Sequence, residues 1–323
     1  MIPTHRIVTT LCAGWLLGAS SLFAESLERS HPKIMVTLPP QTWLVERILG
    51  GPEGMVGCLL GPNDSPATFQ PSDAQITQLA RADLFFRIGV PAERAPWFRA
   101  IEAADRPTVV DLRDGIELRK MEHHHHHHDH GHHGHHGHDH HGHAESSEAE
   151  SDGLDPHVWL SPQRLQIMAD TIAQALSRAN PSNASSYRSN AAQLKEELDS
   201  LEKELRARLD ALDDRAFFVF HPAWGYFADD FGLRQVAIET EGKDPSEKEL
   251  TRLLQLGREL GIRVIFVQPQ FRGRAAATVA DALGARIVTF DPLVADIPAN
   301  LRKAAELLLT APMAPNGATG HPR

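Results

Sequence analysis

The chain has 323 residues, a formal net charge of −10 and an aromatic content of 6%. An acidic chain with few aromatic side chains argues against nucleic acid as a partner. A mature chain of about 300 residues is more than one hydrophobic core usually covers, so we expect two lobes.

The first 24 residues predict a secretory signal peptide. Arg6 precedes an apolar stretch over 7–19, and Ala24 supplies the small residue at the cleavage position. The stretch is too short for a permanent membrane-spanning helix. We therefore expect a periplasmic protein, secreted through a cleavable signal and not itself membrane-spanning, whose mature chain begins near Glu25. Cys58, the one thiol left after cleavage, is expected to be a buried apolar filler.

Short apolar runs alternate with helical patterns along the rest of the chain. The predicted strands are 33–38, 55–60, 83–88, 107–112, 216–220, 234–238, 263–267 and 286–290. The predicted helices between them are 40–49, 72–81, 92–103, 222–231, 246–260 and 272–283. Strand and helix in alternation predict parallel sheets covered on both faces. The expected fold class is α/β, with two lobes that are each a four-stranded, mostly parallel sheet flanked by helices.

Two further helices separate the two sets of strands. One is predicted over 162–179, with Ser161 as its N-cap. The other is predicted over 183–212, where leucines recur every three or four residues among charged ones. We interpret the second as a long, rigid linker helix packed along both lobes. The lobes then cover 31–180 and 213–312.

A histidine tract interrupts the first lobe. Fifteen of the 20 histidines lie within 123–143, together with four glycines and two aspartates. Nothing in this segment can enter a core, so we expect a disordered loop over 121–151 whose imidazoles form an accessory metal-binding loop. An affinity tag is less favoured, because the run is internal and irregular. The tract histidines are His123, His124, His125, His126, His127, His128, His130, His132, His133, His135, His136, His138, His140, His141 and His143.

Three potential metal ligands lie in turns between elements. His221 follows the strand 216–220, Asp291 follows the strand 286–290, and His157 directly precedes the helix 162–179. In open parallel α/β sheets, ligands bind outside the carboxyl ends of the strands. Each residue alone is more often only a helix cap, but the three together, in a chain that carries a histidine tract, predict one metal site.

Four segments carry a resemblance to a known family. They are the sequence DPHVWLSP over 155–162, the long helix with Tyr187 and Asn190, the segment 221–227, and FDPL over 290–293. In this order they resemble the metal-specific solute-binding proteins of ABC importers, and within that family the zinc-uptake members, which often carry a histidine-rich loop. The resemblance implies Zn²⁺ bound between the lobes by His157, His221 and Asp291, and delivery to a membrane permease driven by a cytoplasmic ATPase. We expect the protein to be a monomer.

The chain departs from the family pattern at Ala67, where the family has a histidine. Three ligands are one short of the tetrahedron of tightly bound zinc. Water or a histidine of the tract is favoured equally as the fourth ligand. Carboxylates are less favoured alternatives, namely Asp64, Glu239 and Glu241.

Other functions remain open at this point. The tract could itself act as a metal buffer or sensor, and the shortage of histidines leaves a manganese carrier of the same fold as an alternative. An enzyme is not expected, because the chain has no H-E-x-x-H, G-x-S-x-G or G-x-x-x-x-G-K-[ST] motif.

Overall fold

A computed structural model describes residues 31–51, 54–122, 153–240, 242–271 and 274–310. The predicted signal peptide, the histidine tract and Glu241 lie outside the described residues. Within the described ranges, no helix is both long enough and apolar enough to cross a membrane.

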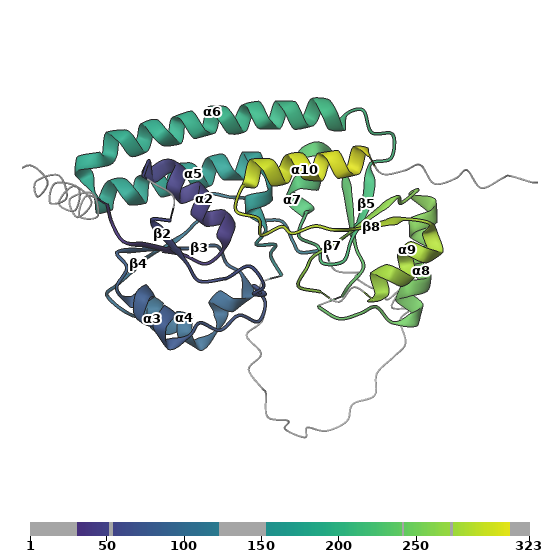
Figure 1. The fold of residues 1–323 in the computed structure, drawn as a ribbon, viewed down its shortest axis with the longest axis horizontal. Helices are drawn as coiled ribbons and strands as arrows, with labels where there is room; N and C mark the ends of the chain where they lie inside the picture. Colours follow the sequence, from purple (N-terminus) through teal and green to yellow (C-terminus); the bar gives the residue numbers. More distant parts are fainter. Residues whose placement is uncertain (1–30, 52–53, 123–152, 241, 272–273, 311–323) are drawn as a thin grey trace, which may run out of the picture.

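Two four-stranded parallel sheets form the frame of the molecule (Figure 1), as the alternation of strands and helices predicts. The first has the order β2-β1-β3-β4, and the second β6-β5-β7-β8. Each strand is shorter than its predicted apolar run, because the ends of the runs enter the connecting loops. The strands are β1 (Ile34–Val36), β2 (Val56–Cys58), β3 (Leu84–Arg87), β4 (Thr108–Asp111), β5 (Ala216–Val219), β6 (Arg234–Ala237), β7 (Val264–Val267) and β8 (Arg286–Thr289).

Helices connect successive strands in both lobes. In the first lobe they are α2 (Pro39–Leu49), α3 (Asp73–Ala80) and α4 (Pro96–Glu102), and in the second α7 (Gly225–Phe231), α8 (Glu247–Glu259) and α9 (Arg274–Leu283). The single helix predicted over 92–103 is instead a 3-10 turn, η1 (Pro91–Arg94), followed by α4. Pro96 breaks it, since proline disfavours the helical conformation in the preceding residue, and Ala95 has a ψ of 158°.

The helix α5 (Pro162–Ala179) has the predicted bounds, and the Ser161 hydroxyl accepts a hydrogen bond from the Arg164 N–H at 3.1 Å. The long helix α6 (Ala184–Leu209) follows and ends three residues before its predicted end. It packs along α5 and also contacts α2, α7 and α10 (Ile297–Leu309). Figure 1 shows it running over both lobes, so the interpretation as a long helix packed along both is confirmed.

One continuous hydrophobic core joins the lobes. It extends from Phe85 in the first sheet through Leu198 of α6 to Phe266 in the second sheet. A smaller cluster, including Ile265 and Leu253, fills the other face of the second sheet beneath α8 and α9. The two sheets are therefore held in place by a shared interior as well as by the long helix.

Candidate metal centre

A cavity of about 180 Å³ lies between the lobes, at the carboxyl ends of strands from both sheets. Its wall is made by loops that follow β2, β3, β5, β7 and β8, and by the segment before α5. This is where an open parallel sheet presents a ligand site. The lining residues that bear on the chemistry are Ala67, Met121, His157, His221, Gln270 and Phe271.

His157 enters the cavity from the segment that precedes α5. Its side chain is buried, and its Nδ1 lies 2.7 Å from Oδ1 of the fully buried Asp155. The same oxygen accepts the His157 backbone N–H at 2.9 Å. The carboxylate therefore holds the ring with Nδ1 protonated and leaves Nε2 as the nitrogen that can bind a metal.

Burial sets the charge of His157. Desolvation lowers the pKa of this imidazole below its ordinary value; Asp155 offsets part of this decrease, and the nearby His221 and Arg119 lower the pKa slightly further. The ring is therefore neutral at neutral pH. A neutral imidazole is the form that binds a metal ion.

His221 enters from the opposite lobe, directly after the last residue of the apolar run that contains β5. Its Nδ1 lies 2.8 Å from Oε1 of Glu239, a buried carboxylate at the end of the neighbouring strand β6. The Gln268 amide donates to the His221 carbonyl at 3.0 Å and accepts from the His221 N–H at 3.3 Å. Phe271 stacks on the ring with centroids 5.5 Å apart. These contacts fix both the backbone and the ring of His221.

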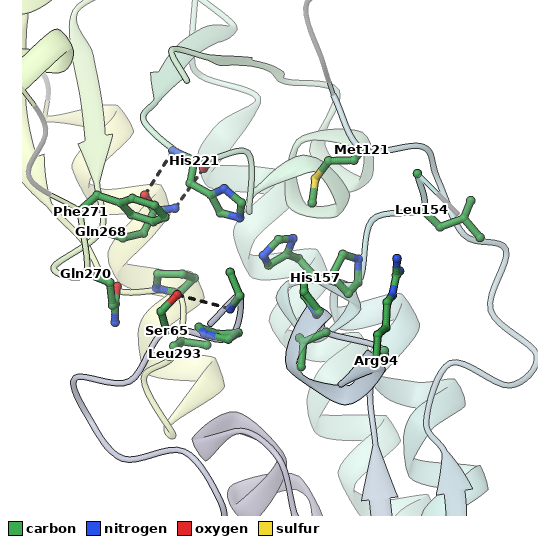
Figure 2. A pocket seen from close by; sticks show the side chains of 18 residues that line it. Ser65, Arg94, Met121, Leu154, His157, His221, Gln268, Gln270, Phe271 and Leu293 are labelled. Carbon is green, nitrogen blue, oxygen red and sulfur yellow. Dashed lines mark hydrogen bonds between the residues drawn. The ribbon is translucent and has the colours of Figure 1, made fainter. Parts of the chain in front are cut away.

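The two imidazoles meet in the cavity (Figure 2). Their centroids are 5.3 Å apart and their planes are inclined by 68°. Each has its Nδ1 paired with a buried carboxylate, which is the arrangement that orients metal-binding histidines in proteins. The structure thus brings together two of the three ligands expected from the sequence.

Asp291 lies after β8, as expected, but not on the cavity wall. Its Oδ1 accepts the Leu293 N–H at 2.9 Å, and its carbonyl oxygen accepts from Asn300 at 3.0 Å. The next two residues, Pro292 and Leu293, do line the cavity. In the described part of the chain, no group of three or more His, Cys, Asp or Glu side chains is close enough to hold a metal ion. Asp291 therefore directly precedes two cavity-lining residues but does not join the histidine pair in this structure.

The candidate positions for a fourth ligand differ in whether they line the cavity and in whether their side chains are already hydrogen-bonded. Ala67 lines the cavity, where the family pattern has a histidine. Asp64 is not among the lining residues, and its Oδ2 accepts the Gly61 N–H at 2.8 Å. Glu239 is paired with His221, and its second oxygen accepts the Gly242 N–H, so both of its oxygens are engaged within the protein. Glu241 and the tract histidines lie outside the described residues.

Sequence reasoning missed several supporting side chains. Asp155 belongs to the quoted DPHVWLSP segment, and its position two residues before His157 was the available signal. Gln268 directly follows β7, so the strand-end rule that indicates His221 also applies to it. Nothing local to Phe271 or Trp159 distinguishes them from core aromatics.

The chain is similar in sequence to zinc-uptake and zinc-binding proteins. The model of the family "Zinc-uptake complex component A periplasmic" (ZnuA) matches residues 34–305. The zinc-binding protein AdcA of Streptococcus pyogenes serotype M3 is 28% identical over 295 residues, which cover 89% of this chain and 54% of AdcA. The high-affinity zinc uptake system protein ZnuA of Brucella abortus is 35% identical over 146 residues, 44% of this chain and 43% of that protein. The chain thus spans about half the length of AdcA.

A solved structure is similar as well. The crystal structure of a ZnuA deletion mutant with zinc bound has a TM-score of 0.73 and 32% sequence identity. It covers 87% of this chain and 98% of the other. The two-lobed α/β fold is therefore shared over essentially all of that protein.

Proposed function

The chain belongs to the ZnuA family, the periplasmic component A of the zinc-uptake complex, and we propose that it captures Zn²⁺ between its lobes and delivers it to an ABC importer. In this proposal the protein works in the periplasm, and its partners are a membrane permease and a cytoplasmic ATPase. The names of its relatives, which include zinc-binding and zinc-uptake proteins, support zinc as the cargo.

The observation that carries the proposal is the histidine pair. Two imidazoles from opposite lobes lie 5.3 Å apart, and each is held by a buried carboxylate through Nδ1. Carboxylate–histidine pairs raise the basicity of the ligand and fix its orientation. Both Nε2 atoms are then available to one ion, and neutral imidazole suits zinc.

Asp291 is the proposed third ligand. Its neighbours already line the cavity, and among the described residues only its Oδ1 is engaged, by the Leu293 N–H. In this proposal the loop after β8 moves on zinc binding and brings the other oxygen to the ion. The fourth position, left open by Ala67, is taken by water or by a histidine of the tract. With three protein ligands, the site resembles an open zinc site more than a closed structural one.

The deciding experiment is a zinc titration of the chain from which only residues 123–143 have been deleted. We expect one equivalent bound more tightly than micromolar, and its loss in His157→Ala and His221→Ala. His31→Ala is the matched control, because His31 contacts Tyr187 away from the cavity. Absence of the tight site would refute the proposal. Loss of nearly all bound metal on tract deletion would instead support a metal buffer or sensor.

Manganese is the alternative cargo. Carboxylate and water ligands favour it, but the two buried carboxylates nearest the rings, Asp155 and Glu239, are both engaged by imidazole nitrogens. The donors proposed for an ion in the cavity therefore include two imidazole nitrogens beside the Asp291 carboxylate, and the imidazole pair supports zinc. A competition titration in which Mn²⁺ displaces Zn²⁺ at equal concentration would overturn this choice.

A further inference from the structure

The histidine tract is attached to the protein by a short antiparallel stem, which we define as residues 119–122 and 153–155. Lys120 and Leu154 form an antiparallel bridge, and the Met121 N–H donates to the Gly153 carbonyl at 2.7 Å. The Asp155 N–H donates to the Arg119 carbonyl at 2.9 Å. The stem therefore ends at the carboxylate that holds His157.

Arg119 links this stem to the other lobe through its side chain. Its Nη2 lies 2.8 Å from Glu122 on the stem, and its Nε lies 3.1 Å from Asp229 of α7. Its Nη1 lies 3.6 Å from Oδ2 of Asp155. One guanidinium thus faces three carboxylates, two on the stem and one on the lobe that carries His221.

The space for this guanidinium is formed by two adjacent residues of α7. A Cβ atom at Gly225 would overlap Nη1 of Arg119, so the close approach requires glycine here. The Tyr226 hydroxyl accepts the Arg119 N–H at 3.1 Å and donates to the Asp155 carbonyl at 2.8 Å. The Arg119 guanidinium also lies 6.0 Å from the centre of the Tyr226 ring. The fit is steric as well as electrostatic.

We propose that Arg119 is a positioning residue for the metal site, which holds Asp155, and through it His157, against the lobe that carries His221. This inference rests on the proposed zinc function. Oδ1 of Asp155 binds His157 while Oδ2 faces Arg119, so the guanidinium fixes the carboxylate from the side opposite the imidazole. Both Nη1 of Arg119 and Oδ2 of Asp155 are buried and have no hydrogen-bond partner among the described residues. The dependence runs mainly one way: Oδ2 of the buried Asp155 faces the Arg119 guanidinium, whereas Arg119 is also paired with Glu122 and Asp229.

The test is a double-mutant cycle on zinc affinity. The parent protein is the chain from which only residues 123–143 have been deleted. Arg119→Met is expected to weaken zinc binding by about 10-fold, as removal of an orienting partner typically does. Asp155→Asn is expected to weaken it by at least as much. In the Asp155→Asn background, Arg119→Met should have no further effect on affinity, because the residue through which it acts is already altered.

Arg164→Met is the matched control. Arg164 also lies over the Tyr226 ring, at 5.0 Å, but its ion pair is with Asp230. Its removal is expected to lower stability and to leave the zinc dissociation constant within about 2-fold.

Arg119→Lys, which keeps the charge but not the planar fork, should recover part of the affinity. If Arg119→Met does not fold, Arg119→Lys takes its place in the double-mutant cycle. Gly225→Ala should reproduce the loss seen with Arg119→Met.

Two results overturn the inference. One is an Arg119→Met affinity within 2-fold of the parent, and the other is an equal loss in the presence and absence of Asp155→Asn, which would indicate a purely structural role. A parent without a tight zinc site refutes the proposed function itself, and the inference with it. The parent titration therefore separates the two failures.

Discussion

The indole nitrogen of Trp159 donates a hydrogen bond to the carbonyl oxygen of Pro292 at 2.9 Å. Trp159 lies two residues after His157, in the 3-10 turn η2 (Val158–Leu160), and Pro292 directly follows Asp291. The bond therefore connects the segment of one proposed histidine ligand to the loop of the proposed carboxylate ligand. Both Trp159 and Pro292 are buried, so water does not readily replace the bond.

Trp159→Phe tests this connection. It keeps an aromatic side chain but removes the indole N–H, which leaves the Pro292 carbonyl without its donor. We expect the free energy of unfolding of the metal-free protein to fall by about 1–3 kcal/mol. We also expect weaker zinc binding, because the loop after β8 loses its attachment to the His157 segment. Chemical denaturation and zinc titration measure the two effects.

Trp97→Phe is the control for Trp159→Phe. The Trp97 indole nitrogen is buried and has no hydrogen-bond partner among the described residues. Its removal should therefore cost less stability than the loss of the Trp159 bond, and zinc binding should not change. Equal effects of the two substitutions on zinc affinity would contradict the proposed link between the loops.

Glu239→Gln tests whether Glu239 orients His221. The amide can still accept from Nδ1 but lacks the negative charge of the carboxylate. We expect the zinc dissociation constant to rise by about 10-fold, and Glu239→Ala to raise it by up to about 100-fold. Glu247→Gln, an exposed carboxylate at the start of α8, serves as control and should not alter affinity. An unchanged constant in Glu239→Ala would remove Glu239 from the site.

The lowered pKa of His157 predicts a pH dependence of stability in the metal-free protein. Burial holds the folded-state pKa below the ordinary value of 6.5, so just below that pH the unfolded chain binds more protons. This contribution to stability is therefore complete above pH 6.5 and is lost as the pH falls through the folded-state pKa. Denaturation curves of the parent and His157→Asn, recorded from pH 7.5 downward, isolate it by difference.

The pH dependence is taken from the difference in unfolding free energy between the parent and His157→Asn, because Asp230 changes the stability of both in the opposite direction. Desolvation raises the pKa of that carboxyl to about 6, so its contribution grows as the pH falls between about 6 and 4. Asp230 is present in both proteins and cancels. Parallel stability curves for the parent and His157→Asn would show that His157 titrates alike in the folded and unfolded states.

The fold could be predicted because its signals are local. Apolar runs of strand length alternate with helical patterns, and that order alone implies parallel sheets with helical connections. The helix α10 was nevertheless missed, although Asp296 caps it by accepting the Ala299 N–H at 3.0 Å. The apolar residues of α10 follow a proline-containing loop. No strand follows α10, so the alternation of strands and helices did not predict it.

The site could be predicted only in part, because its geometry depends on how the lobes meet. The strand-end rule indicates His221 and Asp291 separately, but the 5.3 Å separation of His157 and His221 depends on the shared core beneath α6. Residue type alone also could not distinguish a carboxylate that binds the metal from one that accepts a hydrogen bond from a histidine. Glu239 was considered as a ligand from the sequence, and the structure pairs it with His221.

Ala67→His tests the open position of the site directly. Ala67 lines the same cavity as both histidines, and its loop is held in place by the Ala92 N–H, which donates to the Pro66 carbonyl at 2.9 Å. In the chain lacking residues 123–143, an added imidazole should convert an open site into a more complete nitrogen-rich tetrahedron and strengthen zinc binding by about 10-fold, or 1.4 kcal/mol. Thr68→His is the control, because Thr68 is exposed but does not line the cavity. Equal affinities in the two variants would mean that the imidazole added at position 67 does not bind the ion, and would contradict an open position there. A gain that is seen without the tract and disappears when the tract is present would mean that a tract histidine fills the position.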